Sequence, residues 1–237
     1  MVDSHPGLAE RLADVDERIV DAARGAGRDP AEITRIVVTK FHPVSLVEEL
    51  RGLGVRDMGE NRQQELSAKV AELSSDARTG MDALRWHFIG QAQANKARAI
   101  RAAASFVHSI DRARIADAFD AAGDAEGPPL DVLVQVNLTS DPARGGVVPG
   151  ELEALATHVM GCRTLRLRGL MAVAPLDEDA AWAFARLAGY ADRVRAVAPD
   201  ASWISAGMTA DFPAAIAHGA THLRIGSAIT GPRPARD

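Results

Sequence analysis

The sequence predicts a (β/α)8 barrel of the TIM type, preceded by one extra helix at the amino end. Short apolar segments rich in β-branched residues alternate with amphipathic segments along the chain, and eight of them are strand candidates. No two strand candidates adjoin as a hairpin. Alternating strands and helices form a parallel sheet, and eight such units in one chain favour a closed barrel. An open doubly wound sheet is the alternative, although no GxGxxG follows the first strand.

The first half contains the extra helix and four strand–helix units. Apolar side chains recur at helical spacing over residues 7–26, which predicts the opening helix. The segment 36–40 (IVVTK) predicts a buried strand, and Pro43 begins the helix after it. The remaining units are strands 55–61, 86–90 and 106–110, each followed by a helix over 63–73, 92–104 and 112–122.

The second half continues the alternation. Strands are predicted over 132–137, 167–173, 203–205 and 222–225, with helices over 150–160, 179–197 and up to His218. Acidic residues 177–179 are expected to form a solvated loop that caps the helix after them. The Gly/Pro stretches 123–129 and 142–150 are only as long as loops. We therefore expect a single domain over residues 1–237.

Composition excludes several classes of function. The net charge is −5, which does not suit a nucleic-acid partner. With one cysteine and scattered histidines, neither a disulfide nor a metal site is expected. The chain start lacks the pattern of a secretory signal, and no stretch approaches the roughly 18 apolar residues of a membrane span. The sequence predicts a soluble, cytoplasmic protein without a membrane partner.

Lys40 is the first candidate for chemistry. Active sites of these barrels lie at the carboxyl ends of the strands, and Lys40 ends the first predicted strand. An amine beside an apolar barrel mouth is disfavoured as a charged ammonium, which favours a Schiff base with an aldehyde. The alternative is a lysine whose amine reaches solvent at the strand end. The chain contains only three lysines among 27 basic residues.

The last two strand ends suggest a phosphate site. Barrels frequently bind phosphate between the loops after the seventh and eighth strands. Here these loops are 205–209 (SAGMT) and 226–227 (GS), whose glycines, hydroxyls and helix-opening amides suit an anion. Arg224 precedes the second loop, and an inward side chain would meet a ring nitrogen of the ligand. The alternatives are ordinary turns and an exterior arginine paired with a helix. His87 is interpreted as a buried structural histidine in the barrel interior.

Eight motifs occur in order over residues 36–231: VVTK, GENRQQE, WHFIGQAQANK, VHSID, VLVQVN, RLRGLMAV, SAGMTADFPAAI and HLRIGSAITG. Together they resemble the pyridoxal phosphate homeostasis protein family, which shares its fold with the amino-terminal barrel of alanine racemase. The resemblance implies pyridoxal 5′-phosphate (PLP) bound to Lys40 as a Schiff base, an internal aldimine. It places Arg224 at the pyridine nitrogen and Asn61 near the ring. The implied phosphate-holding positions are Ser205, Gly207, Thr209, Gly226 and Ser227.

The sequence departs from the family pattern at three places near this site. Residues 41–43 (FHP) follow the lysine where Thr-Lys-Pro is more usual. Ala206 stands where methionine is common, and Gln91 stands where histidine is common. None of these changes removes an implied cofactor contact. Each could change access to the lysine or release of the cofactor.

The resemblance implies cofactor storage and delivery more than catalysis, so no catalytic residue is expected. Alanine racemase takes its second base, a tyrosine, from another domain of a partner subunit. The only tyrosine here, Tyr190, lies in the predicted helix 179–197. We expect a monomer that binds PLP and contacts PLP-dependent apo-enzymes transiently. The alternatives are a weakly active PLP-dependent amino-acid racemase or lyase, and a barrel enzyme acting on a sugar phosphate.

Overall fold

Eight parallel strands close into a barrel in which each strand pairs with its neighbours in sequence, and β8 pairs with β1. This computed structural model describes residues 5, 7–73, 83–141 and 143–232. The closed order confirms the predicted barrel and excludes the open-sheet alternative. The strands are β1 (Thr34–Val38), β2 (Asp57–Glu60), β3 (Arg85–Phe88), β4 (Phe106–Ile110), β5 (Leu130–Gln135), β6 (Leu165–Met171), β7 (Trp203–Ser205) and β8 (His222–Ile225).

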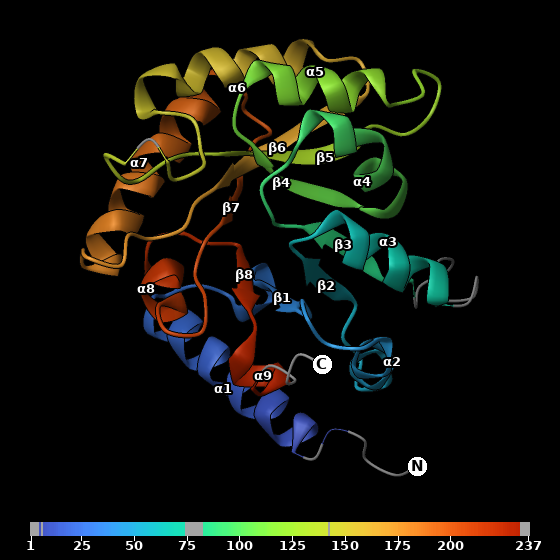
Figure 1. The fold of residues 1–237 in the computed structure, drawn as a ribbon. Coiled ribbons are helices and arrows are strands. Elements are labelled where there is room, and N and C mark those ends of the chain that lie inside the picture. Colours follow the sequence, from blue (N-terminus) through green and yellow to red (C-terminus); the bar gives the residue numbers. More distant parts are fainter. Residues whose placement is uncertain (1–4, 6, 74–82, 142, 233–237) are drawn as a thin grey trace.

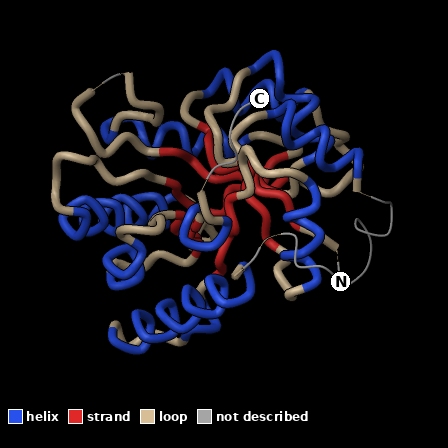
Figure 2. Tube along the Cα trace, turned by 60° about the horizontal axis from the view of Figure 1, so that its bottom comes forward, coloured by secondary structure: helices blue, strands red, loops and turns tan. Residues whose placement is uncertain are grey.

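Helices surround the strands as an outer ring (Figures 1 and 2). Their bounds are α1 (Leu8–Gly25), α2 (Val44–Gly52), α3 (Gln63–Glu72), α4 (Ala97–Ala103), α5 (Ala113–Ala121), α6 (Leu152–Gly161), α7 (Ala180–Val197), α8 (Phe212–Ala217) and α9 (Ser227–Thr230). The described residues also form short 3-10 turns, namely η1 (Pro30–Glu32), η3 (Ala94–Lys96) and η4 (Pro149–Glu151). The predicted helix 92–104 is thus replaced in its first part by η3.

The extra helix α1 lies against the end of the chain, beside α8 and α9 (Figure 1). Its predicted apolar face is buried in full. Arg11 Nε donates to the Ile229 carbonyl at 2.8 Å, and Arg28 donates to the Ala220 carbonyl at 2.6 Å. These bonds join α1 and the turn after it to the segments on either side of β8, the strand that carries Arg224.

Several local predictions are confirmed. Asp179 caps α7, since its carboxylate accepts from the Ala181 amide at 2.7 Å. His87 is buried, and its ring stacks on Phe106. Strands β1 and β5 end two residues earlier than expected, so Lys40 lies in the turn after its strand. Most of the chain start and Pro142 of the loop 142–150 lie outside the described residues.

Candidate functional site

A cavity of about 320 Å³ opens at the carboxyl ends of β1, β7 and β8. Five of the eight predicted cofactor-binding residues line it together. Its volume lies at the lower end of the range for small-molecule sites. The five residues are Lys40, Thr209, Arg224, Gly226 and Ser227.

The turn that carries Lys40 is supported by a buried ion pair. Lys69, from α3, donates to the Thr39 carbonyl at 2.8 Å and to Glu60 at 2.5 Å. The Thr39 hydroxyl donates to the same Glu60 oxygen at 2.7 Å. Burial raises the pKa of Glu60, and the Lys69 ammonium opposes that rise. Because these groups hold the peptide just before Lys40, they fix where its side chain begins.

Phe41 adopts an unusual backbone conformation directly after Lys40. Its φ is 69°, in the left-handed region, and it is the one non-glycine residue there in the described part of the chain. Such a conformation costs on the order of 1 kcal/mol or more, and it is common at functional sites. The Phe41 amide donates to Glu65 at 2.9 Å, and the Arg62 guanidinium lies 5.1 Å from its ring centroid. Phe41, which departs from the family pattern, is therefore held against the start of α3 by its amide and its ring.

The loop after β7 is shaped by Gly207. Its φ is 90°, and a Cβ there would lie 2.8 Å from the Cβ of Ala215 in α8. The Gly207 carbonyl accepts from the Arg224 amide at 2.9 Å, which extends the pairing of β7 and β8 beyond the strands. Gly207 therefore lets the loop after β7 pack closely against α8. In this position the loop places Thr209 at the cavity that Ser227 also lines.

Arg224 lies inside the barrel, not on its exterior. Its guanidinium is buried and donates to the Ser205 hydroxyl at 2.7 Å and to the Ala172 carbonyl at 2.8 Å. Burial lowers the pKa of Arg224 to about 10, while Asp211 opposes the change. The side chain is therefore charged at neutral pH. Both of these acceptors are neutral groups, so a ligand in the cavity meets a cation without a directly bonded carboxylate among the described residues.

Two further predicted residues do not line the Lys40 cavity. Ser205 is fully buried, and its hydroxyl contacts His108 Nδ1 at 2.9 Å as well as Arg224. Asn61 lines a separate cavity with Gln91, at the ends of β2 and β3. The buried Asn61 Oδ1 has no hydrogen-bond partner among the described residues. The roles predicted for Ser205 and Asn61 stay predictions.

The cavity lining combines positive charge with hydroxyl and apolar groups. Lys40 and Arg224 are its basic residues, and its lining within the described chain contains no acidic side chain. Hydroxyls come from Thr209, Ser227 and Thr230. Apolar surface is contributed by Val38, Ile89 and Met208. An amine, a guanidinium, hydroxyls and apolar walls suit a small planar ligand with an aldehyde and a phosphate.

His42 is a cavity residue that the sequence prediction missed. It is buried, and it lines the same cavity as Lys40. Burial lowers its pKa, and the positive charges of Lys69 and His5 act in the same direction. A neutral histidine two residues after the lysine could have been proposed from its position at a strand end.

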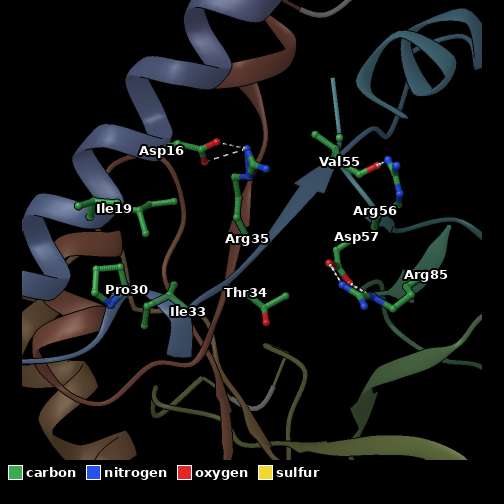
Figure 3. Close-up of a pocket in the computed structure, with 12 residues that line it drawn as sticks. Asp16, Ile19, Pro30, Ile33, Thr34, Arg35, Val55, Arg56, Asp57 and Arg85 are labelled. Atoms are coloured by element: carbon green, nitrogen blue, oxygen red, sulfur yellow. Dashed lines mark hydrogen bonds and ion pairs between the residues drawn. The ribbon is translucent and has the colours of Figure 1, made fainter. Parts of the chain in front are cut away.

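The opposite mouth of the barrel holds a second cavity, of about 360 Å³, shown in Figure 3. It lies where β1, β2 and β3 begin. Arg35 pairs with Asp16 of α1 at 2.8 Å, and Arg85 pairs with Asp57 at 2.5 Å. In Figure 3 dashed lines join both pairs among the side chains that line the cavity. Two of the three arginines that line this cavity are thus matched with carboxylates, whereas Arg56 donates to the Arg51 and Val55 carbonyls.

Two other features bear on the sequence predictions. Asp117 of α5 lies with His158 and Cys162, from the end of α6, as a group with metal-ligating atoms within 4.8 Å of one another. The His158–Asp117 hydrogen bond of 2.6 Å explains most of this proximity. Burial, with a smaller contribution from the nearby Asp120 and Asp117 carboxylates, raises the pKa of Cys162 to about 11. Among the described helices, none is long and apolar enough to cross a membrane.

Comparisons with known proteins agree with this geometry. The family model described as alanine racemase, N-terminal domain, matches residues 34–234. A protein of Mycobacterium bovis named pyridoxal phosphate homeostasis protein is 40% identical, covering 99% of this chain and 96% of its own. One of the same name from Pseudomonas aeruginosa is 42% identical, covering 95% and 96%.

Solved structures give the same result. PipY of Synechococcus elongatus, solved with PLP bound, superposes with a TM-score of 0.81 at 32% identity. The match covers 94% of this chain and all of PipY. An alanine racemase of Clostridium difficile superposes with a TM-score of 0.67 at 14% identity, covering 94% of this chain and 57% of the racemase. The second likeness concerns the fold alone.

Proposed function

Because this chain belongs to the pyridoxal phosphate homeostasis proteins, with their alanine racemase N-terminal domain, we propose that it binds PLP in the Lys40 cavity and stores it for delivery. The observation that carries this proposal is the meeting of Lys40, Arg224 and Ser227 in one cavity. These residues come from opposite ends of the sequence, and the closing of the barrel between β8 and β1 brings them together.

Each group has a part in the proposed binding. PLP supplies an aldehyde, which the Lys40 amine holds as a Schiff base. Thr209 and Ser227 hydroxyls, with the amides that open α9 after Gly226, suit the phosphate. Arg224 donates to the ring nitrogen, and since arginine only donates, that nitrogen stays unprotonated. Asn61 stays a proposed neighbour of the ring.

Storage is favoured over turnover by what faces the cavity. Tyr190, the only tyrosine, lies in α7, packed against the hydrophobic core beside Arg193. It does not line the Lys40 cavity. An unprotonated ring nitrogen is also a weaker electron sink than a protonated one, which disfavours chemistry on bound amino acids. The predicted monomeric state, cytoplasmic location and transient contacts with apo-enzymes stay predictions.

A weak amino-acid racemase or lyase is the second candidate, and His42 is the observation that favours it. This neutral, buried histidine shares the cavity with Lys40. It could therefore move a proton on a bound amino acid. Sustained conversion of L-alanine or L-threonine by the PLP-loaded protein, lost in His42→Ala, would establish this activity and overturn pure storage.

Binding is tested by spectroscopy and chemical trapping. Adding PLP to the purified protein should give a visible absorption band, and borohydride should fix the ligand to one lysine. The sequence contains only Lys40, Lys69 and Lys96, so peptide mass spectrometry identifies the modified residue clearly. Lys40→Ala should lose the adduct. Lys96→Ala, which changes a lysine of the separate Asn61 cavity, is the matched control. An adduct on another lysine, or none, would contradict the proposal.

A further inference from the structure

A continuous chain of polar side chains runs through the barrel interior from Arg224 to Asp57. Arg224 Nη1 lies 2.7 Å from Ser205 Oγ, which lies 2.9 Å from His108 Nδ1. His108 Nε2 lies 2.9 Å from His87 Nδ1, and His87 Nε2 lies 2.9 Å from Asp57 Oδ1. The chain thus joins the cavity at the carboxyl ends of the strands to the cavity at their amino ends.

The two ends of the chain, together with the neutral state of its two histidines, determine the direction of every hydrogen bond. Arginine can only donate, so Ser205 accepts from Arg224, and His108 Nδ1 is the acceptor within reach of the Ser205 proton among the described residues. Hydrogen bonds to His87 and Arg85 outweigh burial and lower the pKa of Asp57 to about 2, so its carboxylate only accepts. Burial lowers the pKa of both histidines, which are therefore neutral. Each then carries its proton on Nε2 and donates toward Asp57.

Both ends lead to the same tautomers. Starting from Asp57, His87 must donate through Nε2 and accept through Nδ1, so His108 must donate through Nε2. Starting from Arg224, the Ser205 hydroxyl accepts from the guanidinium and keeps its proton for His108 Nδ1, which agrees with the same tautomer. No link in the chain has two donors or two acceptors facing each other, as a consistent network requires.

Such an alignment compensates the buried charge of Arg224. A buried cation without a bonded carboxylate is costly unless oriented dipoles face it. Here every dipole of the chain turns its negative end toward Arg224, and Asp57 supplies the opposing charge at the far end. Arg85 holds that carboxylate with two hydrogen bonds, drawn as dashed lines in Figure 3.

We propose that Ser205, His108, His87 and Asp57 are positioning residues that hold Arg224 as a fixed donor, so that Asp57 at the far mouth tunes how the cavity ligand is bound. This inference rests on the proposed function, in which that ligand is PLP. It gives Ser205 a different part from the phosphate-holding one implied by the family resemblance. The Ser205 hydroxyl serves Arg224 and His108, and it lies outside the cavity lining.

Histidine NMR of the protein without PLP tests the chain itself. ¹⁵N spectra, assigned with His87→Gln and His108→Gln, should show both rings neutral with the proton on Nε2 from pH 6 to 8. His158 is an internal control, because it bonds to Asp117 between α6 and α5, outside the barrel interior. Ser205→Ala should change the His108 signals and leave those of His158 in place. A charged ring or an Nδ1–H tautomer at either position in the wild type would overturn the chain.

PLP affinity tests the coupling between the two mouths. Asp57→Asn should weaken binding by about 3- to 10-fold and shift the visible absorption band, a normal size for coupling through a network. Ser205→Ala, adjacent to Arg224, should weaken it by about 10-fold. Asp131→Asn is the matched control, since Asp131 pairs with Arg166 through the same two nitrogens and is equally buried, yet bonds to no histidine.

The outcomes separate this inference from the proposed function. Equal effects of Asp57→Asn and Asp131→Asn, in variants whose NMR spectra show a native fold, would overturn the coupling. Unchanged affinity in Ser205→Ala would do the same. If the wild type took up no PLP, the proposed function and the tuning would both fail, whereas the hydrogen-bond chain would stand or fall on the histidine spectra.

Discussion

The two mouths of the barrel use charged residues in opposite ways. At the amino ends of the strands, arginines pair with carboxylates in partly exposed positions. The side chains of Arg85 and Asp57 are 54% and 11% exposed, and those of Arg166 and Asp131 are 55% and 12% exposed. At the carboxyl ends, Arg224 is buried and bonds only to neutral acceptors. One mouth balances its charges within the protein, and the other leaves positive charge facing a cavity.

The two mouths therefore differ in how much binding energy they offer to a ligand. A partly exposed ion pair contributes about 1 kcal/mol or less, so the amino mouth offers little to a ligand. A buried cation with oriented dipoles gains much more from an acceptor that enters its cavity. The buried carboxylate pair near the Lys40 turn, Glu60 with Lys69, holds the backbone.

The largest effect is expected from breaking the Glu60–Lys69 pair. Lys69→Met leaves the buried Glu60 carboxylate without its partner and removes the bond to the Thr39 carbonyl. Unfolding in urea should show a loss of about 3–5 kcal/mol. Adding Glu60→Gln to this variant should recover part of the loss, because the unpaired charge is then gone. A loss below about 1 kcal/mol would mean that the pair behaves like those at the amino mouth.

Arg224→Met should weaken PLP binding by about 10- to 100-fold, because a charge-assisted hydrogen bond is lost in a buried site. Arg166→Met removes an arginine of similar type from the amino mouth and should change affinity by less than about 2-fold. Both are measured by titration with PLP, followed by absorption. Equal losses in the two variants would show that the arginines act through overall charge instead of position.

Asp57 should give the protein a pH dependence at acid pH. Its pKa is lowered from 3.8 to about 2 on folding, so its stabilising contribution is present above pH 4 and is lost as the pH falls toward 2. This contribution to the free energy of unfolding is about 2 kcal/mol. Urea unfolding at pH 4 and pH 2 should show a smaller decrease in Asp57→Asn than in the wild type. If Asp131→Asn reduced the decrease as much, the histidine bond would not be its cause.

The smallest effect is expected at the amino mouth, away from the chain of histidines. Asp131→Ala removes an ion pair whose arginine is about half exposed. Unfolding experiments should show a loss of about 1 kcal/mol or less. The effect should shrink at high salt, which screens exposed pairs. A loss as large as that of Lys69→Met would remove the distinction between the exposed and the buried pairs.

Much of this protein could be read from its sequence. The alternation of apolar segments determined the barrel, because period and length distinguish buried parallel strands from helices. The same reading placed Lys40, Arg224 and Ser227 at strand ends, where parallel strands bring their carboxyl ends to one face. It also located the helix cap at Asp179 and the buried position of His87. All of these depend on local pattern and on the order of the strands.

Only the tertiary structure decided which of these side chains meet. Ser205 ends β7 and Thr209 lies in the loop after it, yet one hydroxyl turns into the barrel and the other faces the cavity. The chain from Arg224 to Asp57 joins residues of β8, β7, β4, β3 and β2, far apart in sequence. Such contacts depend on the tilt and stagger of closed strands, which no single segment encodes. Local pattern and strand order were therefore enough to locate the face of the site, whereas the packed interior decided what holds Arg224 there.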